Sequence, residues 1–297
     1  MDFLVCIDDT DTIDSIGTGT ICEMIKAEII DKNLATCTNI TRHQLLIHDD
    51  IPYTSHNSSM CFTGQLLKGS KQDIIDLAID VVMKNHALGS DPGVSVSMVD
   101  ELIRVNDLIS FGVKATREVL TKEQAYKLAN DCQVHLSEHG GSGQGIIGAL
   151  AGIGLRLSGA NGELKGVLKK IVESKFTVED LLKDEGIDRV MTDEGDSLGK
   201  EEIVMIKNQT KVMLKEHLFT LLVHKTQEGY VAFNKKEIRQ LQLGHVIVKE
   251  FEVCGMFKAD VDEEIVSEET RTCVNCIYRR WIMTGMACTL DKENDHV

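Results

Sequence analysis

The segment DFLVCIDDTDTIDSIGTGTIC near the N-terminus constrains the fold more than any other part of this chain. Residues 3–7 form a short apolar run with β-branched members, which is typical of a buried strand. Three carboxylates, Asp8, Asp9 and Asp11, follow at once. A glycine-rich turn then leads into an apolar periodic segment that predicts a helix over residues 20–33. The sequence therefore predicts a strand, an acidic turn, a glycine loop and a helix in this order.

This order suits a phosphorylated ligand and its metal ion. Gly17, Thr18 and Gly19 lie where backbone N–H groups could approach a phosphate, and the start of a helix adds partial positive charge. Carboxylates one or two residues apart at a strand end can bind Mg²⁺, which prefers oxygen ligands. A solvated acidic loop is the alternative interpretation, because Asp, Thr, Ser and Gly are also common in turns.

A second glycine-rich segment, HGGSGQGIIGALAGIGLRLSG, covers residues 139–159. Gly141, Gly143 and Gly145 precede a helix rich in small residues, so we predict a second phosphate-binding loop there. The segment matches GxGxxG, but it lies mid-chain after a poor strand, so it is weak as a dinucleotide-binding fingerprint. Close packing of the helix against another backbone is the alternative reason for its glycines.

The rest of the chain predicts an α/β or α+β fold with a mixed sheet, flanking helices and a smaller β-rich C-terminal domain. We expect an ATP-binding domain over 1–165, a charged helical connection over 166–200 and a β-rich domain over 201–297. The predicted strands are 35–40, 44–48, 60–66, 94–98, 203–206, 211–214, 219–223, 230–233 and 246–253. The predicted helices, beside the two above, are 70–87, 99–108, 121–131 and 163–173.

Length and charge limit the possible partners. The 297 residues have room for two domains, and no apolar run is long enough to span a bilayer. The N-terminus lacks the basic region of a signal peptide, so we expect a cytoplasmic protein with no membrane partner. The net charge of −15 disfavours a large RNA partner such as tRNA, because nucleic acids are bound largely through Lys and Arg.

Nine cysteines in a chain without an export signal indicate free thiols or metal ligands rather than disulfides. Five of them lie singly among apolar residues, as small buried side chains do. Cys254, Cys273, Cys276 and Cys288 contain one CxxC pair, and four such thiols can bind zinc or an iron–sulfur cluster. Reduced structural or redox-active thiols are the alternative.

Several motifs, in order, resemble one family, the archaeal isoleucine-tRNA agmatinylcytidine synthetases. IDDTD at 7–11 with GTGT at 17–20 looks like the opening of the ATP-dependent kinase domain of that family. The proline-containing loop at 51–57, the Pro-Gly-Val at 92–94 and the helix beginning GIIGALAGIG at 145 are similar to later motifs of the same domain. The resemblance covers residues 1 to about 160. The basic loop of the family is replaced here by uncharged and histidine side chains, and its arginine before the last helix by Gln144.

The resemblance implies that ATP and Mg²⁺ are bound by Asp8, Asp9 and Asp11, and that the reaction is phosphoryl transfer. In the family a threonine after the glycine turn becomes phosphorylated; alignment on Gly17 places Thr20 there, with Thr18 as the alternative. The acceptor substrate is not implied.

Two other functions fit parts of the sequence. Asp9-Thr10-Asp11-Thr12 after a strand is similar to the DxDxT box of haloacid-dehalogenase-type phosphatases, but the acidic pair expected downstream is incomplete at 195–200. A non-catalytic nucleotide or metabolite sensor, linked to redox state through the last four cysteines, is the other alternative.

Overall fold

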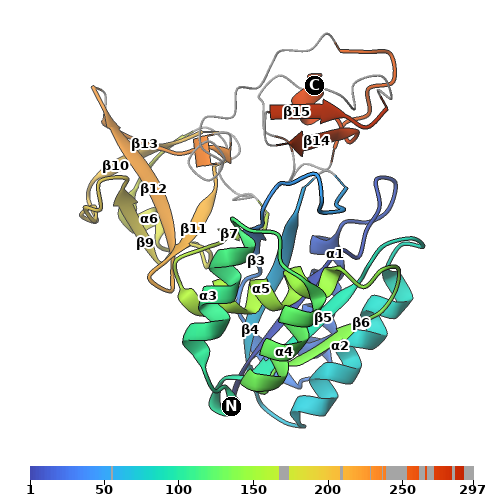
Figure 1. Cartoon of the computed structure of the whole chain (residues 1–297). Helices are drawn as coiled ribbons and strands as arrows, with labels where there is room; N and C mark the ends of the chain where they lie inside the picture. The colour runs from blue at the N-terminus through green and yellow to red at the C-terminus, as the bar shows by residue number, and fades with distance from the viewer. Residues whose placement is uncertain are drawn as a thin grey trace. The chain divides into compact units, whose positions relative to one another are not determined.

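The computed structural model describes residues 1–54, 56–166, 174–207, 210–227, 229–235, 237–238, 253–260, 265, 271–282 and 285–290. The chain divides into two compact units, Met1–Gly162 and Glu163–Val297 (Figure 1). The finer division that we predict near residue 200 is not tested by this partition and stays a prediction.

The first unit is built on an antiparallel sheet with the strand order β6-β5-β1-β4-β3, in which β2 also pairs with β4. The strands are β1 (Asp2–Asp8), β2 (Ala35–Cys37), β3 (Thr41–Gln44), β4 (Ser58–Leu66), β5 (Gly93–Met98) and β6 (His135–Glu138). The strand β1 therefore has a neighbour on each side, and its last residue, Asp8, lies opposite Gly93 of β5.

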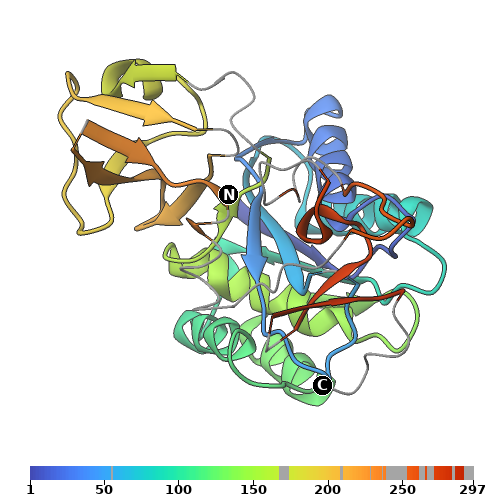
Figure 2. The same ribbon diagram turned by 90° about the horizontal axis from the view of Figure 1, so that it is seen from above.

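Helices cover both faces of this sheet, as the blue and green helices on either side of the strands show in Figure 2. They are α1 (Thr18–Asp31), α2 (Lys71–Asn85), α3 (Val105–Ala115), α4 (Lys122–Cys132) and α5 (Gly145–Ser158). One face packs against α1 and α2, and α5 lies on the other face and contacts β1, β4 and β5. Within the unit, α3 packs along α5 and so forms an outer layer.

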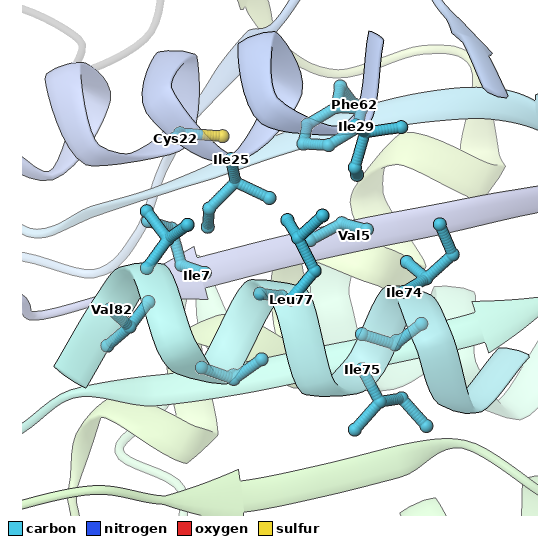
Figure 3. Close-up of a cluster of buried hydrophobic side chains, with 14 of the residues drawn as sticks. Val5, Ile7, Cys22, Ile25, Ile29, Phe62, Ile74, Ile75, Leu77 and Val82 are labelled. Carbon is cyan, nitrogen blue, oxygen red and sulfur yellow. The ribbon is translucent and has the colours of Figure 1, made fainter. Parts of the chain in front are cut away.

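Alternation along β1 explains this arrangement. Phe3, Val5 and Ile7 are buried against α1 and α2, whereas Leu4 and Cys6 are buried on the side of α5. Figure 3 shows the first of these clusters, where side chains of both helices meet those of β1 and β4. A strand that is buried on both faces reads as a continuous apolar run, which is what residues 3–7 show. Each large apolar side chain buried here contributes about 1.5–3 kcal/mol.

The second unit has a core of its own. Its strands are β7 (Glu163–Leu164), β8 (Ser174–Thr177), β9 (Arg189–Thr192), β10 (Ile203–Ile206), β11 (Val212–Lys215), β12 (Leu218–Thr226) and β13 (Gly229–Ala232), with a one-turn helix α6 (Val178–Leu181). They follow the order β7-β11-β12-β13-β10-β8, and the pairs β10–β13 and β9–β12 are parallel. A separate hairpin joins β14 (Arg279–Ile282) and β15 (Gly285–Cys288).

The predicted fold class is confirmed: a sheet with flanking helices is followed by a β-rich C-terminal part. Four details differ from the prediction. The strand expected at 44–48 lies earlier, as β3, and the helix expected at 99–108 is a short 3₁₀ turn (Val99–Glu101) followed by α3. The helix expected over 163–173 begins as the strand β7, and β8, α6 and β9 occupy much of the segment expected as a helical connection. Most of the strand expected at 246–253 lies outside the described residues.

In the described part of the chain, every helix is too short or too polar to cross a bilayer.

Candidate functional site

A cleft lies at the carboxyl end of β1, in the first unit. One part of its lining is polar and comes from the acidic turn and from the first turns of α1 and α5: Asp8, Asp9, Asp11, Thr18, Gln144, Gly145 and Gly148. The other part comes from the segment that leads into β4 and from the end of α3 and the residues after it, and it mixes apolar and polar side chains. Its polar members are Asp50, Thr54, His56, Asn57, Ser58 and Glu118. Its apolar members, called the apolar wall below, are Leu45, Ile51, Pro52, Tyr53, Ala115, Val119 and Leu120. Residues more than a hundred positions apart in the sequence therefore meet around one cleft.

The acidic turn is held by a hydroxyl network around Thr18. Thr18 Oγ1 donates a hydrogen bond to Asp11 Oδ1 at 2.5 Å, and it accepts from Thr10 Oγ1 at 3.1 Å and from Thr10 N at 3.3 Å. Both threonines are buried. Asp9, which directly follows β1, has a φ of +52°. This is a left-handed backbone conformation that Asp tolerates better than most residues. The turn thus presents one threonine hydroxyl in a fixed orientation against a carboxylate.

Two carboxylates of the cleft, those of Asp8 and Asp9, resist ionisation. Burial raises the pKa of Asp8 well above its usual value, and the neighbouring Asp9 carboxylate raises it further. Burial also raises the pKa of Asp9 to about 7, with further contributions from Asp91 and Asp11. Three acidic groups that repel one another in a partly dry site are stabilised when a cation binds between them.

Two helices begin at this cleft. Thr18 is the first residue of α1 and Gly145 the first residue of α5, and both line the cleft. The start of a helix carries unpaired N–H groups and partial positive charge, which favours anions. Gly148, one turn into α5, approaches Asp8 so closely that a Cβ at this position would overlap the Asp8 carboxylate. Only glycine allows α5 to lie this close to the end of β1.

The loop between β6 and α5, residues 139–144, is fixed by Asp91. The Asp91 carboxylate accepts hydrogen bonds from the backbone N–H of Ser142 and, at 2.5 Å, from its hydroxyl. Gly143 has a φ of +75°, which favours glycine. We refer to residues 139–144 below as the glycine loop.

The structure brings together only some of the residues that the sequence singled out. Asp8, Asp9, Asp11, Thr18 and Gly145 line the cleft. The other singled-out residues are not part of its lining: Gly17, Gly141 and Gly143 lie in the adjoining turns, and Gly19 and Thr20 lie in the first turn of α1.

The apolar wall of the cleft and the role of Asp91 did not emerge from sequence reasoning. Leu45 and Val119 carry no motif, and Tyr53 lies in the family-like loop at 51–57, which sequence reasoning did not place in the site. The fold alone brings these segments to β1. Asp91 stands directly before a proline and a strand, and its position beside a glycine loop fifty residues later is not visible locally.

The donor groups of the acidic turn fit Mg²⁺. Within the described residues, no three His, Cys, Asp or Glu side chains are arranged as a ready-made metal cage. Mg²⁺ does not require one, since it commonly binds one or two protein carboxylates together with substrate phosphates and water. Asp8, Asp9 and Asp11 supply such carboxylates at one strand end.

The four C-terminal cysteines do not form a metal-ligand set in the described residues. Cys254 and Cys288 are exposed, Cys273 is partly buried and Cys276 is buried. Burial raises the pKa of the Cys273 thiol, and the other three thiols raise it further, so the four lie within electrostatic range of one another. A zinc ion or cluster at this position stays a prediction.

No protein-family model matches this chain, and a search of curated proteins gives no match. Among solved structures, a tRNA fluorescent labeling enzyme shares 23% identity at a TM-score of 0.45, covering 52% of this chain and 36% of that one. The apo form of TiaS, a tRNA agmatidine synthetase, shares 22% identity at the same TM-score, covering 52% and 35%. A complex of TiaS with tRNA and ATP shares 23% identity, again at 0.45, covering 52% and 36%.

This chain resembles TiaS over about half of its length. The resemblance inferred from the sequence motifs is therefore confirmed. The chain spans only about a third of the length of the structures that it matches. A likeness at this identity and TM-score carries no argument about function, which has to be argued from the residues of the cleft.

Proposed function

We propose that the first unit binds ATP with Mg²⁺ in the cleft at the end of β1 and transfers its γ-phosphoryl group. One observation carries this proposal: Asp8, Asp9 and Asp11 share a cleft with the first turns of α1 and α5. Carboxylates for a metal ion and two helix N-termini for an anion are the parts that phosphoryl transfer requires, because its catalysis depends on positioning and charge stabilisation. The apolar wall offers a surface for the base of the nucleotide.

We propose Thr18 rather than Thr20 as the first acceptor. Thr18 lines the cleft and already donates its proton toward Asp11, whereas Thr20 is outside the lining. In the transfer step Thr18 Oγ1 attacks the γ-phosphorus, and the bond between that phosphorus and the β–γ bridging oxygen breaks. ADP leaves, and the hydroxyl proton passes to the Asp11 carboxylate. A bound Mg²⁺ would neutralise charge on the phosphate oxygens.

The test is mass spectrometry of the full-length protein after incubation with Mg-ATP. We expect a phosphothreonine at residue 18, lost in Thr18→Val and retained in Thr20→Val. Asp9→Asn should abolish Mg-dependent ATP binding in calorimetry, while Asp80→Asn on the exposed face of α2 should leave it unchanged. ATP binding and turnover that are the same in Asp9→Asn and in wild type would refute the proposal.

A nucleotide sensor without turnover is the second candidate, and one observation favours it. Among the described residues that line the cleft there is no lysine or arginine to neutralise a triphosphate. Saturable, Mg-dependent ATP binding without phosphothreonine or ADP formation would support the sensor over the enzyme.

The partners of the whole protein are also proposals. Solved structures that resemble about half of this chain contain tRNA, ATP or agmatine, which makes these ligands the first to test. The net charge of −15 leads us to expect weak tRNA binding that falls further with added salt. Metal analysis of anaerobically purified protein tests the C-terminal cysteines. About one zinc atom per chain supports a zinc site, and about two or four iron atoms per chain with sulfide support a cluster. Absence of both metals removes the prediction.

A further inference from the structure

A permanently charged side chain would help to hold the polyphosphate proposed above, and the described lining of the cleft contains no lysine or arginine. Lys122, the first residue of α4, stands beside the glycine loop instead. Its ammonium group donates a hydrogen bond to the carbonyl oxygen of Ser142 at 2.8 Å and forms an ion pair with Glu138 of β6. A cation is therefore held directly against the loop that leads into the first turn of α5.

Lys122 contacts the glycine loop at Ser142 and at Gly143, just before the first turn of α5. A Cβ on Gly143 would lie 2.6 Å from its Nζ atom, so the ammonium group sits against the loop backbone at a residue that has no side chain. Leu120, two residues earlier, lines the cleft. The Asp91 carboxylate lies within electrostatic range of both the cleft and Lys122, because it helps to raise the pKa of Asp9 and that of Lys122.

The ion pair can be exchanged. The side chain of Lys122 is 24% exposed and that of Glu138 is 42% exposed, so neither is locked in the core. A partly exposed ion pair contributes little, and less than a charge-assisted hydrogen bond to phosphate in a site shielded from water. Burial raises the pKa of the Tyr126 hydroxyl and the nearby Glu138 carboxylate raises it further, so a hydroxyl stays next to Glu138 when the lysine leaves.

We propose that Lys122 binds the outer phosphates of the nucleotide, and that it changes partner from Glu138 to a phosphate oxygen when the nucleotide enters. This inference rests on the proposed function and adds the missing protein cation to the same site. It assigns Glu138 the opposite role: in the nucleotide-free protein it competes with the ligand for the lysine. The alternative is that Lys122 and Asp91 only hold the glycine loop in shape.

The experiment is calorimetric titration of the full-length protein with Mg-ATP, Mg-ADP and AMP. It compares wild type with Lys122→Met, Lys122→Arg, Glu138→Gln and the control Lys84→Met, which removes an exposed ion pair on α2. We expect Lys122→Met to weaken ATP binding about tenfold or more, ADP binding less, and AMP binding by less than twofold. Lys122→Arg should retain most of the affinity, and Glu138→Gln should tighten ATP binding.

Four outcomes would overturn the inference. Equal loss of ATP and AMP affinity in Lys122→Met, or weaker ATP binding in Glu138→Gln, would mean that the lysine only shapes the loop. If wild type binds ATP and Lys122→Met binds it equally well, the role of Lys122 is refuted while the proposed function stands. Wild-type protein that binds none of the three nucleotides would refute the proposed function, and this inference with it. Thermal unfolding of each variant shows whether any loss of affinity comes from misfolding.

Discussion

At the scale of single residues, the acidic turn lowers the stability of the fold where it forms the proposed binding site. Asp9 sits in a left-handed conformation, partly buried, with Asp91 and Asp11 close enough to oppose its charge. Such local cost is common where a protein prepares a site for a ligand. The cost has a pH dependence, because only the ionised form of the side chain is disfavoured.

We expect Asp9→Asn to stabilise the protein at high pH. The pKa of Asp9 is 3.8 as an ordinary value and about 7 in the fold, so between these values the folded state holds more protons than the unfolded state. The free energy of unfolding therefore falls as pH rises through this window, and the penalty is complete above pH 7. Urea unfolding at pH 8 should show the variant about 1–3 kcal/mol more stable than wild type, and at pH 4 no difference. The prediction would be contradicted if the free energy of unfolding changed by the same amount in wild type and variant between pH 4 and pH 8.

At the scale of elements, the contact between α5 and β1 decides the shape of the site. Gly148 leaves the space that the Asp8 carboxylate occupies. We expect Gly148→Ala to displace either the helix or the carboxylate, with loss of Mg-dependent ATP binding and a destabilisation of about 1–3 kcal/mol. Gly199→Ala is the matched control, because the nearest atom to its added Cβ lies at an ordinary 3.7 Å. Calorimetric ATP titration and urea unfolding measure the two effects, and wild-type ATP affinity in Gly148→Ala would show that the contact is not needed.

The edge strand β6 carries a second titrating group. Ser137 Oγ lies 3.0 Å from His135 Nε2 and 2.7 Å from His139 Nε2. Burial lowers the pKa of both histidines below the usual 6.5; the imidazole of His139 lowers that of His135 further, and the imidazole of His86 that of His139.

Acid should therefore destabilise the fold through β6. Below pH 6.5 the unfolded state binds protons that the folded histidines resist, so the free energy of unfolding falls as pH drops toward the lowered pKa values. Between pH 7 and pH 5, the free energy of unfolding of the double variant His135→Gln with His139→Gln should fall by about 1 kcal/mol less than that of wild type. The exposed His217→Gln serves as the control in urea unfolding at each pH. Equal acid sensitivity of wild type and the double variant would exclude this origin.

Elements with strong local patterns were predictable, and those that depend on distant contacts were not. A continuous apolar run predicts β1, and helical periodicity after Ser70 predicts α2. The Ser70 side chain forms a capping box with Asp73 at the start of that helix. β3 reads Thr-Arg-His-Gln, yet Arg42 and His43 are buried there because β4 pairs with them. Tertiary pairing overrides propensity in such strands. The acidic half of the site is local in sequence and was predictable; its apolar half was not, because separate segments form it.

At the scale of the whole molecule, the two units have separate hydrophobic cores. The clusters of the first unit draw on residues between Phe3 and Leu157, and those of the second on residues between Leu164 and Ile238. Separate cores are the property expected of domains that fold as units.

We expect two transitions in differential scanning calorimetry, only one of which responds to nucleotide. A ligand that binds only the folded first unit stabilises that unit, and at a hundred times its dissociation constant the gain is about 2.7 kcal/mol. Mg-ATP should then raise one midpoint by about 5–10 °C and leave the other in place. AMP at the same concentration is the control for non-specific effects. One common transition that shifts as a whole would contradict independent units.

The contact between Gly148 and Asp8 also predicts how these two positions vary among relatives of this chain. A side chain larger than hydrogen at position 148 and a carboxylate at position 8 exclude each other while α5 stays where it is. Across any set of homologous sequences the two positions should therefore change together. A lineage that acquires alanine or serine at 148 should have given up the acidic group at 8, and with it the metal-dependent chemistry proposed for this cleft.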